Sequence, residues 1–397
     1  MKLASRVSKV STSPTLALDA RTKDLISKGI DVIAFGVGEP DFDTPRHVKD
    51  AAIDAINKGF TKYTASNGIP ELREAVCKKL REDNGLDYKP AQVIVSVGAK
   101  HSIFNAVMAI VGDGEEAIIP SPYWVSYPEM VKIAGGTPVI INLTEAENFK
   151  LTPAKLEAAI TPKTKLVLLN SPSNPTGAVY TRDELAGIAE VCKKHDLFII
   201  SDEIYEKLMH DQAQHISIAS ISEDAKKRTI TVNGVSKAYA MTGWRIGYAA
   251  AEPEIIKAMG DIQSHVTSNA ASISQKAAVA ALLGPQEPLK EMLAEFRKRA
   301  DYMYQRMNTL PGLYCRKPAG AFYVFPNVAG LVGKTIRGRK ITDGEALCDV
   351  LLEHARIAIV PGLGFGNPMN MRLSYATSME KIVEGLNRME TVLKEAV

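Results

Sequence analysis

Apolar runs of four to six residues alternate with amphipathic stretches of helical length through the middle of this chain. This alternation is typical of an α/β domain built around a mostly parallel sheet. The candidate strands cover residues 92–97, 117–120, 137–141, 166–169, 197–200, 229–232 and 246–250. Helical periodicity lies between them, for example over residues 182–195. We therefore expect seven strands, most of them parallel, packed between helices.

The 397 residues are enough for one large and one small domain. A Gly284-Pro285 break follows the alternating region, and beyond it come a long charged helix over 289–310, a strand over 320–325 and a final helix from Met379. This predicts a large domain over 46–284 and a smaller α+β domain over 285–397. The segment 1–45, with a helix and the turn-rich residues 36–42, is expected to join them.

Charge and composition exclude several classes of protein. The 48 Lys and Arg residues nearly balance 45 Asp and Glu residues, so nothing favours a nucleic-acid or membrane partner. No apolar run approaches the ~20 residues that span a bilayer, and the N-terminus lacks an apolar signal core. The four cysteines form no C-x-x-C pair, which favours reduced thiols in the cytoplasm. No histidine spacing is typical of a metal site, and none is assigned.

Polar residues follow several of the expected strands. In an open parallel sheet, ligands bind just outside the carboxyl ends of the strands. Four of the expected strands are followed there by polar or small residues, which are in chain order Gly98 and Ala99, then Asn174, then Asp202 and Tyr205, and finally Lys237. After the first of these strands a helix is expected to begin at Ile103. We expect these residues to share one edge of the sheet.

Lys237 and Arg245, eight positions apart, point to a particular cofactor. A lysine amine becomes catalytically useful when a carbonyl captures it as a Schiff base. An arginine nearby suits an anion such as a phosphate. An aldehyde and a phosphate occur together in pyridoxal 5′-phosphate. The alternative is a surface lysine followed by a strand that carries a structural arginine.

Three of the residues suit the ring of this cofactor. The ring works as an electron sink when its nitrogen stays protonated, which requires an acidic partner. Asp202 ends a strand of buried type and can be that partner, although it could instead cap a helix. Asn174 and Tyr205 can donate hydrogen bonds to the 3′-oxygen.

The phosphate and the ring face need further groups. Gly98 and Ala99 leave backbone N–H groups free at a helix N-terminus, and Arg245 adds a cation. Trp124 follows another strand and offers a stacking surface, although it could simply pack in the core.

Motifs along nearly the whole chain resemble the fold-type I pyridoxal-phosphate enzymes. Within these the chain is similar to the class I aminotransferases, and among them to the bacterial aspartate aminotransferase subgroup. The motifs are G-x-G-E-P-D-F-D-T-P from Gly36, K-Y-T-x-x-x-G-x-x-E-L-R from Lys62, S-P-Y-W-V-S-Y-P-E-M from Ser121, N-S-P-x-N-P-T-G-A-V-Y from Asn170, S-D-E-I-Y-E from Ser201, S-K-A-Y-A-M-T-G-W-R-I-G-Y from Ser236 and M-R-L-S-Y-A-T-S from Met371.

The resemblance implies a role for each cofactor residue: Lys237 forms the Schiff base, Asp202 pairs with the ring nitrogen, Asn174 and Tyr205 contact the 3′-oxygen, Arg245 with the amides of Gly98 and Ala99 binds the phosphate, and Trp124 stacks on the ring. It further implies that Tyr63 reaches the phosphate of a neighbouring subunit, so that the protein is a homodimer with shared active sites.

For the substrates, amino acids and 2-oxo acids, the resemblance implies that Arg372 grips the α-carboxylate. Gly38 offers it a backbone contact, and Trp124 and Asn174 also line the substrate site. Lys100 is the implied cation for a distal carboxylate, with Thr15 nearby. The alternative for Lys100 is a solvated side chain or one that assists the phosphate.

The expected reaction is a ping-pong transfer of the amino group from L-aspartate to 2-oxoglutarate, with Lys237 moving the proton between Cα and the cofactor. Two departures from the family pattern matter. Gly234 stands where many relatives have a phosphate-binding serine. Residues 11–13 stand where prephenate-accepting relatives often read K-P-S.

Other activities remain open at this point. Aminotransferases for aromatic amino acids, alanine or prephenate, and C–S β-lyases, use the same lysine on the same fold. A transcriptional regulator built on this fold would carry a DNA-binding domain before it, and the family motifs begin by Gly36.

Overall fold

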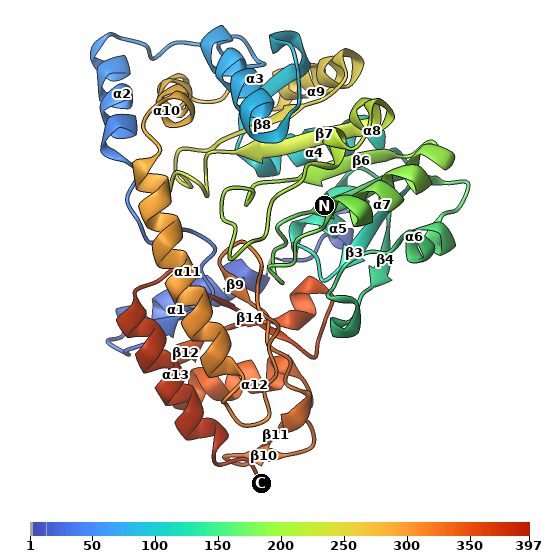
Figure 1. Ribbon diagram of the computed structural model, residues 1–397. Coiled ribbons are helices and arrows are strands. Elements are labelled where there is room, and N and C mark those ends of the chain that lie inside the picture. Colours follow the sequence, from blue (N-terminus) through green and yellow to red (C-terminus); the bar gives the residue numbers. More distant parts are fainter. Residues whose placement is uncertain (1–2, 13) are drawn as a thin grey trace.

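The computed structural model describes residues 3–12 and 14–397; Ser13, the last residue of the stretch compared with K-P-S, lies outside them. Seven strands form the central sheet in the order β2-β8-β7-β6-β5-β3-β4 (Figure 1). Their bounds are Val93–Val97 (β2), Glu116–Ser121 (β3), Thr137–Asn142 (β4), Thr164–Asn170 (β5), Phe198–Asp202 (β6), Thr229–Gly234 (β7) and Ile246–Ala250 (β8). All neighbouring pairs are parallel except the two that involve β8. The expected fold is confirmed.

Helices cover both faces of this sheet because alternate residues of each strand point to opposite sides. Leu166 and Leu168 of β5 pack with α4 (Ala99–Ile110), α5 (Ser126–Ile133) and α9 (Pro253–Val266). Val167 and Leu169 pack on the other face. The helices packed there are α6 (Pro153–Ala159), α7 (Arg182–Lys194) and α8 (Glu223–Arg228). Strands β2 and β8 pack with α2 (Arg46–Asn57), α3 (Pro70–Asn84) and α10 (Ser272–Leu283).

One sequence expectation at the edge of the sheet is wrong. Helix α4 begins at Ala99, four residues before the expected start at Ile103. Gly98 has φ +82, a conformation that glycine adopts easily, and it turns the chain directly from β2 into the helix. Lys100 therefore lies in the first turn of α4.

The C-terminal part forms a second layer of structure below the sheet in Figure 1. Its helices are α11 (Glu287–Met307), α12 (Gly344–Val350) and α13 (Met379–Leu393). They pack with a three-stranded antiparallel sheet of β13 (Val360–Pro361), β14 (Met371–Ser374) and β9 (Tyr323–Val324). The final helix begins at Met379 as expected, and the Gly284-Pro285 break lies between α10 and α11.

Two expected elements of this part have other bounds than the sequence pattern suggested. The strand expected over 320–325 is reduced to β9, because Ala321 has φ +62 and Pro326 cannot extend the ladder. The helix expected over 289–310 runs from Glu287 to Met307, because Pro288 suits a first helical turn and Pro311-Gly312 follow its end.

The N-terminal segment contacts both parts of the chain. Helix α1 (Pro14–Ser27) leads to β1 (Ile33–Ala34), which pairs in parallel with β12 (Ile357–Ala358). Residues 36–39 then cross to the carboxyl edge of the large sheet, where they line a pocket with Lys237. Among the helices of the described residues, none is long and apolar enough to cross a membrane.

Candidate active site

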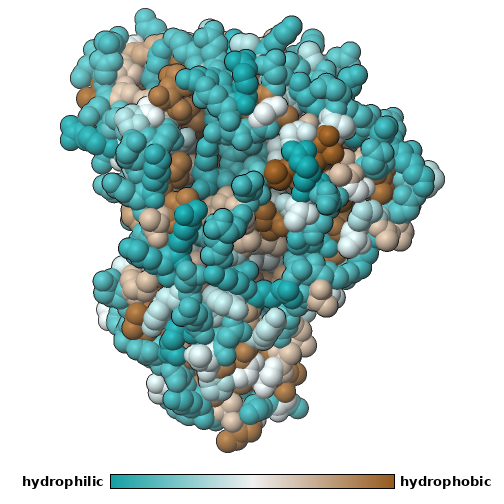
Figure 2. All heavy atoms as spheres, viewed as in Figure 1, coloured by the Kyte–Doolittle hydropathy of each residue, from teal (hydrophilic) through white to brown (hydrophobic). Residues whose placement is uncertain are grey.

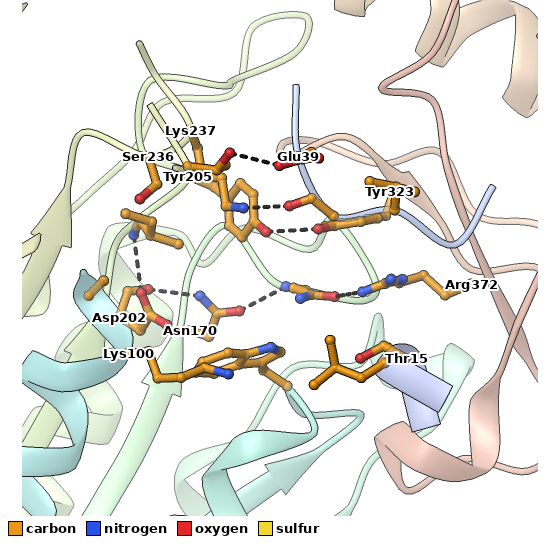
Figure 3. Close-up of a pocket in the computed structure, with 18 of the residues that line it drawn as sticks. Thr15, Glu39, Lys100, Asn170, Asp202, Tyr205, Ser236, Lys237, Tyr323 and Arg372 are labelled. Atoms are coloured by element: carbon orange, nitrogen blue, oxygen red, sulfur yellow. Dashed lines mark hydrogen bonds between the residues drawn. The ribbon is translucent and has the colours of Figure 1, made fainter. Parts of the chain in front are cut away.

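A pocket of about 460 Å³ lies at the carboxyl edge of the large sheet, between that edge, the N-terminal segment and strands β9 and β14 (Figure 3). Eleven of the residues singled out in the sequence line it: Thr15, Gly38, Ala99, Lys100, Trp124, Asn174, Asp202, Tyr205, Lys237, Arg245 and Arg372. The fold brings together residues up to 357 positions apart in the chain, from Thr15 to Arg372.

Lys237 follows β7 and donates a hydrogen bond from Nζ to the carbonyl oxygen of Gly38. The rings of Tyr205 and Phe322 lie 6.0 and 5.7 Å from Nζ. Burial lowers the pKa of Lys237 to about 8, although the Glu39 carboxylate opposes this change. A large fraction of this amine is therefore neutral near pH 8, unlike an ordinary lysine.

Asp202 ends β6 and is 4% exposed. Its Oδ2 accepts a 2.6 Å hydrogen bond from the Tyr127 hydroxyl, and its Oδ1 accepts one from the backbone N–H of Ile204. Burial raises the pKa of Asp202 to about 6, and these hydrogen bonds oppose the rise. Asp202 is thus a buried carboxyl that forms no ion pair with any residue that the structure describes, and it is not the cap of a helix.

Asn170 links the end of β5 to the loop that carries Asn174. Its Nδ2 donates to the carbonyl oxygen of Asp202, and its Oδ1 accepts from the backbone N–H of Asn174. The loop is therefore tied to β6, and the Asn174 side chain is buried beside Arg372.

Arg372 lies on β14 and is 3% exposed. Its Nη1 donates to Oδ1 of Asn174 at 3.0 Å and its Nη2 to the carbonyl oxygen of Gly36 at 2.8 Å. The rings of Tyr323 and Phe365 lie 4.4 and 4.9 Å from the guanidinium carbon. Its buried Nε has no partner among the described residues, so a donor remains for an anionic ligand.

The other end of the pocket suits an anion as well. Helix α4 begins there at Ala99 with no acidic residue in its first turn. Arg245 lies beside this helix terminus and donates to the carbonyl oxygen of Thr242 at 2.8 Å. A Cβ atom on Gly98 would meet the Arg245 guanidinium in its present position, and the φ of +82 at Gly98 also favours glycine here.

Lys100 and Thr15 lie at the rim, on the side of Trp124 (Figure 3). The Lys100 ammonium lies 4.8 Å from the centre of the Trp124 ring, a cation–π contact. Partial desolvation and the nearby charge of Arg245 lower the pKa of Lys100. A cation in this position can bind a second anionic group of a ligand.

Two predicted residues are not in the lining of this pocket. Gly98 directly precedes Ala99 in the chain, as the N-cap of α4. Tyr63 is 90% exposed and lies at a separate surface pocket with Thr61 and Thr267. It therefore cannot serve the pocket of its own chain in this arrangement.

The sequence reasoning missed several lining residues. Three of them, Tyr127, Asn170 and Tyr323, lie inside motifs or expected strands. Their polar side chains at those positions were the signal that could have identified them. Glu39, which accepts a 2.7 Å hydrogen bond from Thr242, lies in the turn-rich segment before α2. Asp19 and Lys23 of α1 had no distinguishing pattern.

A buried charged cluster lies next to Asp202 in the chain. Glu203, Glu206 and His215 place their ligand atoms within 4.8 Å of one another. Lys79 pairs with Glu206, and Glu203 accepts hydrogen bonds from Ser201, Ser217 and His215. Lys79 supplies one cation to the two carboxylates, and the charges of Glu203 and Glu206 raise the pKa of His215 despite its burial, so these residues form a structural charge cluster.

Comparisons with known proteins agree with this geometry. The family model described as aminotransferase class I and II matches residues 30–389. The aspartate aminotransferase of Geobacillus stearothermophilus is 51% identical over 394 residues, covering 99% of both chains. The aspartate/prephenate aminotransferase of Cereibacter sphaeroides is 50% identical, covering 98% of both. The crystal structure of the aspartate aminotransferase from Rhizobium meliloti superposes with a TM-score of 0.97 at 47% identity, covering both chains completely.

Proposed function

This chain belongs to the class I and II aminotransferases, and from that membership we propose that it is an aspartate aminotransferase dependent on pyridoxal 5′-phosphate. In the proposed reaction the amino group of L-aspartate passes to 2-oxoglutarate, which gives oxaloacetate and L-glutamate. The observation that carries the proposal is one pocket lined by the Lys237 amine, the Asp202 carboxyl and the Arg372 guanidinium. Full-length relatives named for this activity support the choice of substrate.

The residues of the pocket fit this cofactor. The buried Asp202 carboxyl, which is paired with no cation in the described part of the chain, suits a protonated ring nitrogen. Lys237, with a pKa of about 8, suits an amine that must be neutral to bond an aldehyde. The α4 terminus and Arg245 suit a phosphate, and Gly98 leaves the space that a Cβ atom would fill.

In the proposed holoenzyme, further residues would hold the cofactor. Trp124 would cover one face of the ring, and Asn174 and Tyr205 would donate to its 3′-oxygen. Tyr63 of the partner subunit would reach the phosphate, which requires a homodimer with shared active sites.

Exposed apolar residues support the dimer. Ile53 and Ile56 of α2 are 51% and 50% exposed, and Leu283 at the end of α10 is 49% exposed. Figure 2 shows hydrophobic residues over these helices at the upper left of the molecule. Such a patch on a protein of this size is typical of an interface.

In the proposed mechanism, the bound cofactor supplies an electron sink that makes the Cα proton of the amino acid acidic. Arg372 binds the α-carboxylate through its fixed guanidinium, which orients the Cα–H bond. Lys237 Nζ is the base that takes this proton and later returns it, and its lowered pKa matches that role. Both half-reactions use the same pocket, so ping-pong kinetics are expected.

Lys100 is the proposed partner of the distal carboxylate, and Thr15, which lines the same pocket, is a proposed further contact of the substrate. A compact ammonium at the rim suits the β-carboxylate of aspartate or the γ-carboxylate of glutamate. The four buried free cysteines are compatible with the proposed cytoplasmic location.

A second candidate function is the amination of prephenate. The relative from Cereibacter sphaeroides, named for both substrates, favours it at 50% identity. Prephenate also carries a second carboxylate for Lys100 to bind. A panel of acceptors with L-aspartate or L-glutamate as the donor separates the two functions.

The absorption spectrum of the cofactor-loaded protein, recorded before and after L-aspartate alone, tests the proposal. We expect a visible band that moves to shorter wavelength as the amino group is transferred. A band that aspartate leaves unchanged would contradict aspartate as donor but not the cofactor. Absence of any band after addition of pyridoxal phosphate would contradict both.

A further inference from the structure

Tyr323, which no sequence motif singled out, touches three parts of the pocket. It lies on β9 and is 1% exposed. Its hydroxyl lies 2.9 Å from the hydroxyl of Tyr205, and its ring centre lies 4.4 Å from the guanidinium carbon of Arg372 (Figure 3). A Cβ atom on Gly38 would lie 3.0 Å from the Tyr323 hydroxyl. The C-terminal part of the chain thus places a hydroxyl against that of the proposed cofactor residue Tyr205, in addition to the ring of Phe322, whose centre lies 5.4 Å from that of Tyr205.

Either hydroxyl can be the donor in the hydrogen bond between Tyr205 and Tyr323, and the proposed chemistry of the site decides which one it is. Each hydroxyl has one proton to donate, and burial raises the pKa of both groups, so both stay protonated. Among the described residues, neither hydroxyl has another hydrogen-bond partner. If Tyr205 donates its proton to the 3′-oxygen of the cofactor, Tyr323 must be the donor to Tyr205.

We propose that Tyr323 is a positioning residue that acts through Tyr205: its hydroxyl donates to Tyr205, so that the Tyr205 proton is committed to the cofactor's 3′-oxygen. This inference rests on the proposed function. Consecutive hydrogen bonds polarise one another, so the Tyr323 bond strengthens the one that Tyr205 donates. The chain of two phenols stabilises negative charge on the 3′-oxygen.

A consequence is measurable in the substrate-free holoenzyme. The Lys237 nitrogen, once bonded to the cofactor, and the 3′-oxygen share a titratable proton. Donors to the oxygen favour its deprotonated form, so they lower the pKa of that proton. Loss of the Tyr323 hydroxyl should raise this pKa, whereas loss of packing alone would not move it in that direction.

The ring of Tyr323 has a separate effect. Its centre lies 4.4 Å from the guanidinium carbon of Arg372. This cation–π contact involves the ring and not the hydroxyl, so Tyr323→Phe keeps it and Tyr323→Leu removes it. We expect Tyr323→Leu to raise the KM for aspartate several-fold more than Tyr323→Phe does. The reason is that Arg372, the proposed partner of the α-carboxylate, loses the aromatic ring that packs against its guanidinium.

The test is a spectrophotometric pH titration of the cofactor-loaded protein and its variants. For Tyr323→Phe we expect the acid constant of the visible chromophore to fall about threefold to tenfold, which means that its pKa rises. This is the expected effect of weakening, but not removing, the charge-assisted hydrogen bond that Tyr205 donates. In a Tyr205→Phe background the same substitution should change nothing further. Tyr314→Phe, at an exposed tyrosine of the same part of the chain, is the matched control.

The outcomes separate this inference from the proposed function. A Tyr323→Phe protein that titrates as the wild type, while Tyr205→Phe is shifted, overturns the inference and leaves the function intact. A shift that persists in the Tyr205→Phe background overturns action through Tyr205. Absence of a chromophore in the wild-type protein overturns the proposed function and the inference with it. Urea unfolding of each variant shows whether the fold is retained.

Discussion

The hydroxyl of Tyr127 donates a 2.6 Å hydrogen bond to Oδ2 of Asp202, and both side chains are buried. A neutral phenol solvates the carboxylate without cancelling its charge. Asp202 therefore keeps a pKa of about 6, raised by burial, and its charge stays available for a cationic ring nitrogen. No cation among residues 3–12 and 14–397 forms an ion pair with this acid.

Substitution of Asp202 by Asn should stabilise the cofactor-free protein and inactivate the enzyme. Because the folded-state pKa of about 6 exceeds the ordinary 3.8, the contribution of Asp202 to stability is full below pH 3.8 and lost as the pH rises through 6. This corresponds to roughly 3 kcal/mol at pH 8, which the neutral amide recovers. We expect urea unfolding of the cofactor-free variant to show this gain at pH 8 and a smaller one at pH 5.

In the same variant the activity should fall by at least about a hundredfold, because the ring nitrogen loses its acidic partner. Tyr127→Phe is the matched control, since it removes the hydrogen bond and keeps the charge. A D202N protein with normal turnover would remove Asp202 from the proposed role.

Glu39 should set the pH at which the cofactor-free protein captures pyridoxal phosphate. Only the neutral Lys237 amine attacks an aldehyde, so the capture rate should rise with pH and level off above about 8. Glu39 raises the pKa of Lys237, so Glu39→Gln should lower the midpoint of this profile. The effect should be modest, because Glu39 is exposed.

The measurement for Glu39 is the rate of absorbance change after mixing protein and cofactor at a series of pH values. Gln can still accept the hydrogen bond from Thr242, which keeps the local structure. Glu254→Gln on α9 is a control at an exposed carboxylate outside the pocket lining. An unchanged or higher midpoint in Glu39→Gln would contradict the prediction.

Lys100 should distinguish dicarboxylic from neutral substrates. Lys100→Ala is expected to lower kcat/KM for L-aspartate and L-glutamate about tenfold to a hundredfold, the value of one charged hydrogen bond. Values for alanine and aromatic donors should change little. Lys23→Ala is the matched control, because Lys23 also lines the pocket but is paired with Asp19 at 2.7 Å. Equal losses on all donors would exclude Lys100 from selecting the distal carboxylate.

Tyr63 provides a test of shared active sites. It is 90% exposed and outside its own chain's pocket, so its proposed role needs a second copy. Lys237→Ala and Tyr63→Ala proteins should each have little activity. After subunit exchange at equal amounts, about a quarter of all sites would combine a native Lys237 with a native tyrosine.

The assay compares the activity of the exchanged mixture with the sum of the two separate variants, under conditions in which subunits exchange. Activity above that sum is the expected result. A mixture that never exceeds the sum, although mass spectrometry shows mixed dimers, would mean that Tyr63 serves no neighbouring site.

Much of the large sheet could be predicted from local pattern. All seven strands were expected, with ends that differ by a few residues, because buried parallel strands require continuous apolar runs. The gathering of Asn174, Asp202 and Lys237 also followed, since parallel strands present their carboxyl ends at one edge. The start of α4 was missed because the positive φ of Gly98 has no sequence signature.

Sequence by itself determined which chemical groups this protein has and, for Asn174, Asp202 and Lys237, which strand end each one follows. Tertiary structure alone decided that Tyr323 meets Tyr205 and that Glu39 influences Lys237. These relationships join segments 118 to 198 positions apart, as from Tyr205 to Tyr323 and from Glu39 to Lys237. The physical reason is that periodicity reports only the nearest neighbours of a residue, whereas burial, and with it each pKa, depends on every segment that packs around the group.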